Sequence, residues 1–234
     1  MTATSPATVV LVHGAFADSS SWNGTIERLR AHGHRVIAAA NPLRGVAEDA
    51  ASVQSVLDRV EGPVVLAGHS YGGSVISAAA VGRPQVRALV YIAGFIPDEG
   101  ESAGELAAKF PGSTLGETLE PTPLADGGVD LYVRQDLFRQ QFAADVPEPQ
   151  ASLMAAGQRP VAAAALDAAS PAPAWKELPV YSLIPTADKN IPPAAQRFMS
   201  ERAEAEIVEI PDASHAVLVS QPEAVAELIL RAAR

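Results

Sequence analysis

Hydrophobic and polar positions follow a regular alternation through the first 93 residues. Short β-branched runs predict strands, and amphipathic segments between them predict helices. The expected strands are Thr8 to His13, Arg35 to Ala40, Val64 to Ala67 and Val86 to Ala93. The expected helices are Trp22 to Ala31, Ala47 to Val60 and Gly73 to Val81. Glycines at 33, 62 and 82 follow the three helices and are typical helix stop signals. This order favours an α/β fold with a mostly parallel sheet.

The same alternation stops near Pro97 and resumes after Trp175. Prolines and glycines are frequent between them, with short amphipathic pieces such as Asp130 to Phe142, and the alanine-rich run Ala162 to Ala165 suggests helix. An insertion of this size between strands usually forms a lid or a substrate pocket. We therefore expect a core domain of residues 1–96 and 176–234 and a lid of residues 97–175.

The end of the chain returns to the alternating pattern. It predicts strand Val180 to Ile184, helix Pro193 to Ala203, strand Glu206 to Ile210 and helix Pro222 to Ala233. The insertion thus divides one sheet in the sequence and does not end it.

Composition narrows the possible partners and the chemistry. The chain has 234 residues, is 48% hydrophobic, and carries a formal net charge of −10 with scattered Lys and Arg, so nucleic acid is an unexpected partner. With no cysteine, it has neither disulfides nor a thiolate nucleophile. Residues 1–6 lack a positively charged leader pattern, and Val9 to Val12 is too short for a membrane span. We expect a cytoplasmic protein without membrane association, either a monomer or a homodimer.

One glycine-rich stretch, Gly68-His69-Ser70-Tyr71-Gly72-Gly73, follows the third expected strand and precedes a helix. A phosphate-binding P-loop requires a lysine that is absent here, and a dinucleotide fingerprint requires a different glycine spacing. The stretch matches Gly-x-Ser-x-Gly between a strand and a helix, which is the context of a nucleophile elbow. The alternative is an ordinary glycine-rich turn. We expect Ser70 to be a nucleophile.

A serine nucleophile needs a general base, and the chain has five histidines. His32 and His34 flank a glycine at a helix end and are expected to face water. His69 adjoins the serine and is expected to support the elbow, and His13 is expected to shape the loop after the first strand. His215 follows the last strand and precedes the last helix, so we expect it to be the base.

The base needs an orienting carboxylate, which should lie between serine and histidine in the chain. Asp188 follows the strand that ends at Ile184, and Asp98 follows the strand that ends at Ala93. Both therefore lie at the same edge of the sheet. Asp212 lies too near His215 in the sequence and is expected to be a surface turn residue. The residues alone leave Asp188 and Asp98 as candidates.

Backbone amides are expected to stabilise the oxyanion. One is the amide of Tyr71, the residue after the nucleophile, and the other comes from the loop after the first strand. We expect the second donor to be Ala15, with Phe16 as the neighbouring alternative.

The motifs together resemble the α/β-hydrolase superfamily, in particular the branch of plant methylesterases, plant hydroxynitrile lyases and bacterial esterases. The resemblance spans nearly the whole chain and is weakest from residue 99 to 175. The motifs that carry it are His13-Gly14-Ala15, Gly68 to Gly73, Phe95-Ile96-Pro97-Asp98, Thr186-Ala187-Asp188-Lys189 and Ser214-His215. The Thr-x-Asp-Lys setting favours Asp188 as the acid, and Trp22 matches the family's aromatic residue in the first loop.

Two departures separate the chain from hydroxynitrile lyases of that branch, which have threonine and lysine where this chain has Gly14 and Ala216. Ser70 also differs from the aspartate nucleophile of epoxide hydrolases and haloalkane dehalogenases. We expect a carboxylic ester hydrolase that uses a Ser-His-Asp acyl-enzyme mechanism without metal or cofactor. The alternatives are a C–C bond lyase, a cofactor-free oxygenase or a ligand receptor on the same fold.

The expected substrate is a small hydrophobic or aromatic ester. Aromatic residues near the loops and in the lid are the candidates to bind it, although lid aromatics often serve only packing. The expected substrate-binding residues are Phe16, Trp22, Phe95, Tyr132 and Phe138.

Overall fold

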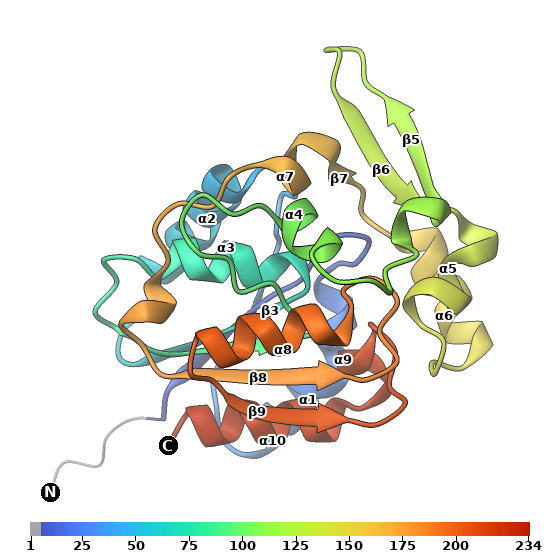
Figure 1. Cartoon of the computed structure of the whole chain (residues 1–234). Coiled ribbons are helices and arrows are strands. Elements are labelled where there is room, and N and C mark those ends of the chain that lie inside the picture. Colours follow the sequence, from blue (N-terminus) through green and yellow to red (C-terminus); the bar gives the residue numbers. More distant parts are fainter. Residues whose placement is uncertain (1–5) are drawn as a thin grey trace, which may run out of the picture.

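A six-stranded parallel sheet forms the centre of the protein (Figure 1). The structure is a computed structural model that describes residues 6–234, so the first five residues of the expected core domain lie outside it. The strand order is β2-β1-β3-β4-β8-β9. These strands are β1 (Thr8–Val12), β2 (Val36–Ala39), β3 (Val64–His69), β4 (Val86–Ile92), β8 (Val180–Pro185) and β9 (Glu206–Ile210). The predicted α/β fold with a sequence-divided parallel sheet is confirmed.

Helices cover both faces of the sheet (Figure 1). Helices α1 and α10 pack on one face, and α2, α3 and α8 pack on the other. The helices of this part are α1 (Asn23–Ala31), α2 (Val46–Leu57), α3 (Tyr71–Ala79), α8 (Pro193–Arg202), α9 (Val217–Ser220) and α10 (Pro222–Ala232), with a 3-10 turn η1 (Ser19–Trp22) before α1.

The strand sequences explain why both faces are covered. In β1, Val9 and Leu11 belong to the hydrophobic cluster under α1 and α10, whereas Val10 and Val12 belong to the cluster under α2 and α3. Successive side chains of a strand point to opposite faces, so an uninterrupted apolar strand needs helices on both sides. All five residues of β1 are buried.

The insertion between β4 and β8 forms a smaller layer above the carboxyl ends of the strands. It contains a three-stranded antiparallel sheet, β5-β6-β7, whose β5-β6 hairpin projects from the molecule (Figure 1). Its elements are α4 (Ala103–Ala108), η2 (Leu115–Thr118), β5 (Leu119–Pro123), β6 (Val129–Val133), α5 (Gln135–Phe142), α6 (Glu148–Gly157), β7 (Val161–Ala162), α7 (Ala163–Asp167) and η3 (Ala174–Lys176).

One local prediction in the insertion needs correction: the run from Ala162 to Ala165, expected to be helical, begins in strand β7 and becomes helix at Ala163. The amphipathic piece from Asp130 to Phe142 is a strand followed by a helix. Phe138 and Phe142 of α5 belong to the same buried cluster as the residues under α2 and α3. The insertion therefore packs on the main sheet's own hydrophobic core, and its treatment as a separate lid domain stays a prediction.

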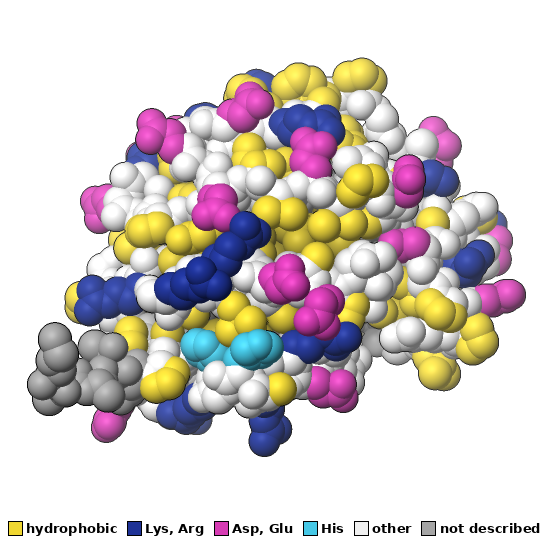
Figure 2. Space-filling view, turned by 90° about the horizontal axis from the view of Figure 1, so that it is seen from below, with side chains coloured by type: hydrophobic (Ala, Val, Ile, Leu, Met, Phe, Trp, Pro, Cys, Tyr) yellow, Lys and Arg dark blue, Asp and Glu magenta, His cyan; other side chains and the backbone are white. Residues whose placement is uncertain are grey.

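The surface beneath the sheet carries mixed charges. Figure 2 shows Lys and Arg interspersed with Asp and Glu on this face, without one large basic region. Between Pro6 and Arg234, no helix is long and apolar enough to cross a membrane.

Candidate active site

Ser70 lies on the sharp turn between β3 and α3. Its backbone has φ 54° and ψ −125°, a conformation that residues other than glycine rarely adopt and that costs about 1–3 kcal/mol. Hydrogen bonds hold the turn: the Ser70 amide donates to the Ile92 carbonyl at 3.1 Å, and the Ser70 carbonyl accepts from the Gly73 amide at 2.9 Å. The strain presents the serine side chain at the carboxyl end of the sheet.

Close backbone packing explains the two glycines that flank the serine. A Cβ on Gly68 would lie 2.5 Å from the carbonyl oxygen of Gly72. A Cβ on Gly72 would lie 2.5 Å from the carbonyl oxygen of Val12 in the neighbouring strand. The turn therefore has no room for a side chain at either position, as the sequence pattern predicts.

Asp188 holds one nitrogen of the His215 ring. Oδ2 of Asp188 lies 2.7 Å from Nδ1 of His215, and both side chains are buried. The carboxylate is held in turn by the amides of Asn190 and Ile191, which donate to Oδ1 at 2.7 and 3.1 Å, and by Nε2 of Gln196, which donates to Oδ2 at 2.8 Å. These donors keep the carboxylate in place, so Nδ1 of His215 carries the proton that Asp188 accepts.

The other ring nitrogen of His215, Nε2, is buried and has no hydrogen-bond partner among residues 6–234. The His215 ring lies 4.8 Å from the ring of His69, which directly precedes Ser70. Ser70 Oγ and Nε2 do not form a hydrogen bond in this structure, and such bonds often tighten only when substrate is present. His215 thus has one nitrogen fixed and the other free beside the elbow.

His69 supports the histidine loop as well as the elbow. Its Nε2 lies 3.0 Å from the carbonyl oxygen of His215. A carbonyl only accepts, so Nε2 of His69 carries the proton. Complete burial, followed by the neighbouring His215, lowers the pKa of His69 well below its usual range. A neutral His69 therefore links the turn of Ser70 to the loop of His215. In the sequence, its position next to the serine indicates this supporting role.

Asp98 lies away from His215. It pairs with Lys176 at 2.5 Å, and its pKa is lowered first by the hydrogen bond from that lysine. His13 lies in the first loop, where Nδ1 contacts the carbonyl of Gly14 at 2.9 Å and Nε2 accepts from the amide of Asn41 at 3.0 Å. Asp188 is thus the only one of the two candidate acids in contact with the histidine.

The first loop places a backbone amide beside the serine. Ala15, Ser70 and Tyr71 line the same cavity. The amide of Phe16 donates to the Arg159 carbonyl at 3.0 Å, whereas the amides of Ala15 and Tyr71 have no acceptor among residues 6–234. This favours the Ala15 amide over that of Phe16 as the second donor to an oxyanion.

A cavity of about 490 Å³ opens above Ser70 and is bounded by α4 and the following loop. Most of its lining is apolar, with Phe95 and Phe16 from the main domain and Ala107, Phe110 and Leu166 from the insertion. Its polar lining is confined to a few groups that include Ser70, Ser113 and Asn190. The site is suited to an uncharged, largely apolar molecule.

Two of the five expected substrate-binding residues, Phe16 and Phe95, line this cavity. The other three do not. Trp22 is fully buried in the cluster under α1 and α10, on the far face of the sheet. Tyr132 lies on the projecting hairpin, beside a small separate hollow. Phe138 is fully buried and stacks on Phe142 at 5.0 Å. Phe138 thus serves packing, whereas Tyr132 neither lines the cavity nor belongs to the buried core.

Sequence reasoning missed several residues of this site. Phe142 packs edge-on against the His215 ring at 4.9 Å, and Gln196 holds the carboxylate of Asp188. The residues of α4 that line the cavity are mostly alanine and glycine. Small residues carry no chemical signal in a sequence, so only the fold reveals them.

Comparisons with known proteins find related hydrolases. The carbendazim-hydrolysing esterase of Nocardioides sp. (strain SG-4G) is 36% identical in an alignment of 118 positions, which covers 44% of this chain and 48% of that protein. Methylesterase 8 of Arabidopsis thaliana is 30% identical in an alignment of 131 positions, which covers 48% of each chain. Each match thus spans about half the length of its relative.

A solved structure of a pyrethroid hydrolase is similar over 97% of both chains, with a TM-score of 0.77 and 25% identity. The model of the alpha/beta hydrolase family matches residues 9–228. That range runs from within β1 into α10 and includes Ser70, Asp188 and His215. The chain belongs to the alpha/beta hydrolase family.

Proposed function

We propose that the protein hydrolyses small carboxylic esters, with Ser70 as nucleophile, His215 as general base and Asp188 as the acid that orients it. The contact between Asp188 and His215 carries the proposal, because it leaves Nε2 as the free nitrogen beside the elbow. The relatives named as esterases and hydrolases support the same chemistry.

The reaction has two halves. Ser70 Oγ attacks the ester carbonyl while Nε2 of His215 takes its proton, and collapse of the tetrahedral intermediate breaks the bond to the alcohol oxygen, which receives that proton. Water then attacks the acyl-enzyme, gives a proton to Nε2, and the released serine recovers it. Asp188 keeps Nδ1 protonated and stabilises the imidazolium.

The amides of Tyr71 and Ala15 are the proposed oxyanion donors. Both amides have no acceptor within the described residues, so each is available to the negative oxygen of the tetrahedral intermediate. Tyr71 begins α3, and the first amides of a helix bear partial positive charge. Loss of one such donor typically raises the barrier by about 3 kcal/mol.

The lining of the cavity indicates the substrate class. Phe16, Phe95 and Phe110 surround Ser70 with aromatic surface, and the lining includes no Lys, Arg, Asp or Glu. Burying a charged acyl group there would leave the charge without a partner, which is costly. A neutral ester with a small hydrophobic or aromatic acyl group is the expected substrate.

Two positions argue against cyanohydrin cleavage, the main alternative activity. Hydroxynitrile lyases have threonine and lysine where this chain has Gly14 and Ala216. A Cβ on Gly14 would lie 2.6 Å from Cβ of Ser70, so a threonine does not fit here. Ala216 is fully buried, and its amide donates to the Phe142 carbonyl at 2.9 Å, so a lysine at this position would carry a buried charge.

The test is a panel of p-nitrophenyl acetate, methyl benzoate and mandelonitrile, assayed with wild type and Ser70→Ala. We expect multiple turnovers of the esters by wild type, and loss of turnover by at least about 10³-fold in Ser70→Ala. A single burst equal to the amount of protein would support a receptor. Cleavage of mandelonitrile without ester turnover would replace hydrolysis by a lyase reaction.

A further inference from the structure

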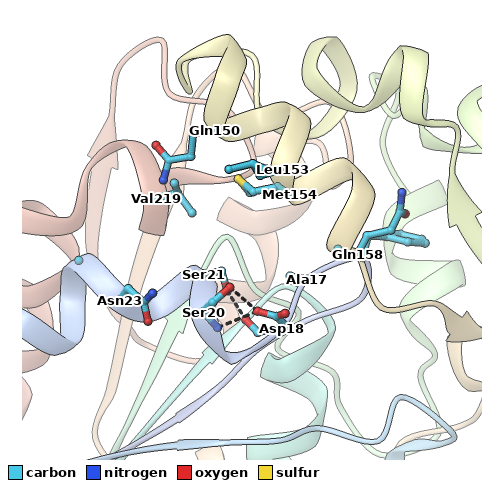
Figure 3. A pocket seen from close by; sticks show the side chains of 13 residues that line it. Ala17, Asp18, Ser20, Ser21, Asn23, Gln150, Leu153, Met154, Gln158 and Val219 are labelled. Atoms are coloured by element: carbon cyan, nitrogen blue, oxygen red, sulfur yellow. Dashed lines mark hydrogen bonds between the residues drawn. The ribbon is translucent and has the colours of Figure 1, made fainter.

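A second cavity lies beneath α6, on the other side of Phe16 from the cavity of Ser70. Its volume is about 300 Å³, and Phe16 is the one residue that lines both cavities. Figure 3 shows Gln150, Leu153 and Met154 of α6 on one side and Asp18, Ser20 and Ser21 on the opposite side. Phe16 therefore lies between the two spaces.

The second cavity also adjoins the loop of His215. Val219, four residues after the histidine, lines it. Phe142 packs against His215 at 4.9 Å and against Phe16 at 6.5 Å, so histidine, Phe142 and Phe16 form one continuous group of rings. The ring of His215 is thus linked to Phe16 through Phe142.

The position of His215 distinguishes the two arms of an ester, the acyl part and the alcohol part. In hydrolysis the histidine protonates the oxygen of the leaving alcohol, so the alcohol arm must run past the histidine. Resting on the proposed esterase activity, we propose that the cavity beneath α6 is the alcohol subsite, that it is entered past Phe16, and that the cavity beside α4 holds the acyl arm.

The lining of the second cavity indicates which alcohols it accepts. Leu153, Met154 and Val219 give it an apolar wall, and serine and glutamine side chains give it uncharged polar groups. Leu153 is 75% exposed and lies at the open side of this cavity. Its one charged residue is Asp18, whose carboxylate already accepts from the amide and hydroxyl of Ser20. The subsite fits a neutral alkyl or aryl alcohol, and an anionic one would meet Asp18.

Phe16 is suited to act as the partition that limits the alcohol. Its φ is 60°, and its amide is held by the Arg159 carbonyl at 3.0 Å, so its backbone is fixed independently of the ring. A substitution of the side chain therefore changes the partition and leaves that backbone hydrogen bond in place.

Two exposed glycines allow a matched test. Gly157 lines the cavity beneath α6, Gly116 lines the cavity of Ser70, and a Cβ at either position meets no atom within 4 Å. Gly157→Trp and Gly116→Trp each add a large ring to the lining of one cavity. Ser152→Trp places the same ring at an exposed position of α6 that lines neither cavity.

The measurement is kcat/KM for two esters, hexyl acetate and ethyl hexanoate. Hexyl acetate has its long chain in the alcohol part, and ethyl hexanoate has it in the acyl part. We expect Gly157→Trp to lower the ratio of hexyl acetate to ethyl hexanoate by about tenfold, and Gly116→Trp to raise it by a similar factor. Phe16→Ala should raise the ratio, and Ser152→Trp should leave it unchanged. Gln150→Trp, at another exposed position that lines the cavity, repeats the first change if Gly157→Trp does not fold.

A ratio that stays constant in Gly157→Trp and Gln150→Trp, or that moves equally in Ser152→Trp, would overturn the subsite. So would a ratio that changes in the same direction in Gly157→Trp and Gly116→Trp. Absence of any Ser70-dependent ester turnover in wild type is a separate result, which rejects the proposed function and the subsite with it.

Discussion

The hydroxyl of Tyr71 donates a hydrogen bond of 2.9 Å to Oδ2 of Asp49. Asp49 is buried at the start of α2 and also accepts from the amide of Arg44 at 3.0 Å. Tyr71, which follows the nucleophile, is thus held at two points. The turn holds its backbone, and Asp49 of α2 holds its hydroxyl. Burial raises the pKa of Asp49 and of Tyr71. This contact anchors the side chain of the residue whose amide the proposed mechanism uses for the oxyanion.

The pKa of Asp49 predicts a pH-dependent contribution to stability. Burial is the main cause that raises it above the ordinary value of 3.8, so the folded state holds this proton more tightly than the unfolded state does. The stabilising contribution is complete below 3.8 and is lost as the pH rises through the folded pKa. We expect wild type to lose stability relative to Asp49→Asn as the pH rises above 3.8, in urea unfolding. A constant difference across about two pH units would contradict the raised pKa.

The two candidate acids should differ in their effect on catalysis. Asp188 contacts Nδ1 of His215, whereas Asp98 pairs with Lys176. We expect Asp188→Asn to lower kcat for p-nitrophenyl acetate by about 10³- to 10⁴-fold, because an amide no longer favours the required tautomer. Asp98→Asn, the matched control, should stay within about twofold of wild type, because a partly exposed ion pair contributes little. A larger loss in Asp98→Asn would show that the acid is wrongly assigned.

The main sheet was predictable because each of its elements carries its own local signal. Strand β9 coincides with the predicted Glu206 to Ile210, and β1 ends one residue before the predicted His13. Uninterrupted β-branched runs need burial on both faces, and glycine stops mark the helix ends. The insertion lacks such signals: β5 includes two prolines, and α6 has no strongly apolar stripe. There the fold depends on contacts with the main core, which one sequence does not reveal.

The residues that carry the proposed chemistry were also easier to predict than those that shape the site. Ser70, Asp188 and His215 are reactive residue types at strand ends in a known order, and the structure brings the last two into contact. Side-chain type gives no comparable guide to cavity walls. Trp22 and Phe138 are aromatic and buried like Phe95, yet only Phe95 of the three lines the cavity, because tertiary packing decides which aromatic faces it.

Two buried histidines predict a loss of stability in mild acid. Burial lowers the pKa of His13 and of His69 below the usual 6.5. Below pH 6.5 the unfolded chain binds protons that the folded chain does not, so the free energy of unfolding falls as the pH decreases. Each such group adds a slope of at most about 1.4 kcal/mol per pH unit. We expect His69→Asn to reduce this slope between pH 6.5 and 5 in urea unfolding, and His34→Asn, at a half-exposed histidine, to retain it. Equal slopes in the two variants would be inconsistent with a neutral His69.

Gly14 sets the distance between the first loop and the nucleophile. A Cβ at this position would lie 2.6 Å from Cβ of Ser70 and 2.7 Å from the carbonyl oxygen of His69, so loop or elbow must move. Misplacement of reacting groups by about 1 Å costs about 10²-fold in rate. We expect Gly14→Ala to lower kcat/KM for p-nitrophenyl acetate by at least about 10²-fold, with a loss of about 1–3 kcal/mol in the free energy of unfolding. Gly45→Ala, where a Cβ meets no atom within 4 Å, should change neither quantity by a comparable amount. Wild-type kcat/KM in Gly14→Ala would mean that the loop adjusts without displacing the serine, and that the Ala15 amide does not need its present position.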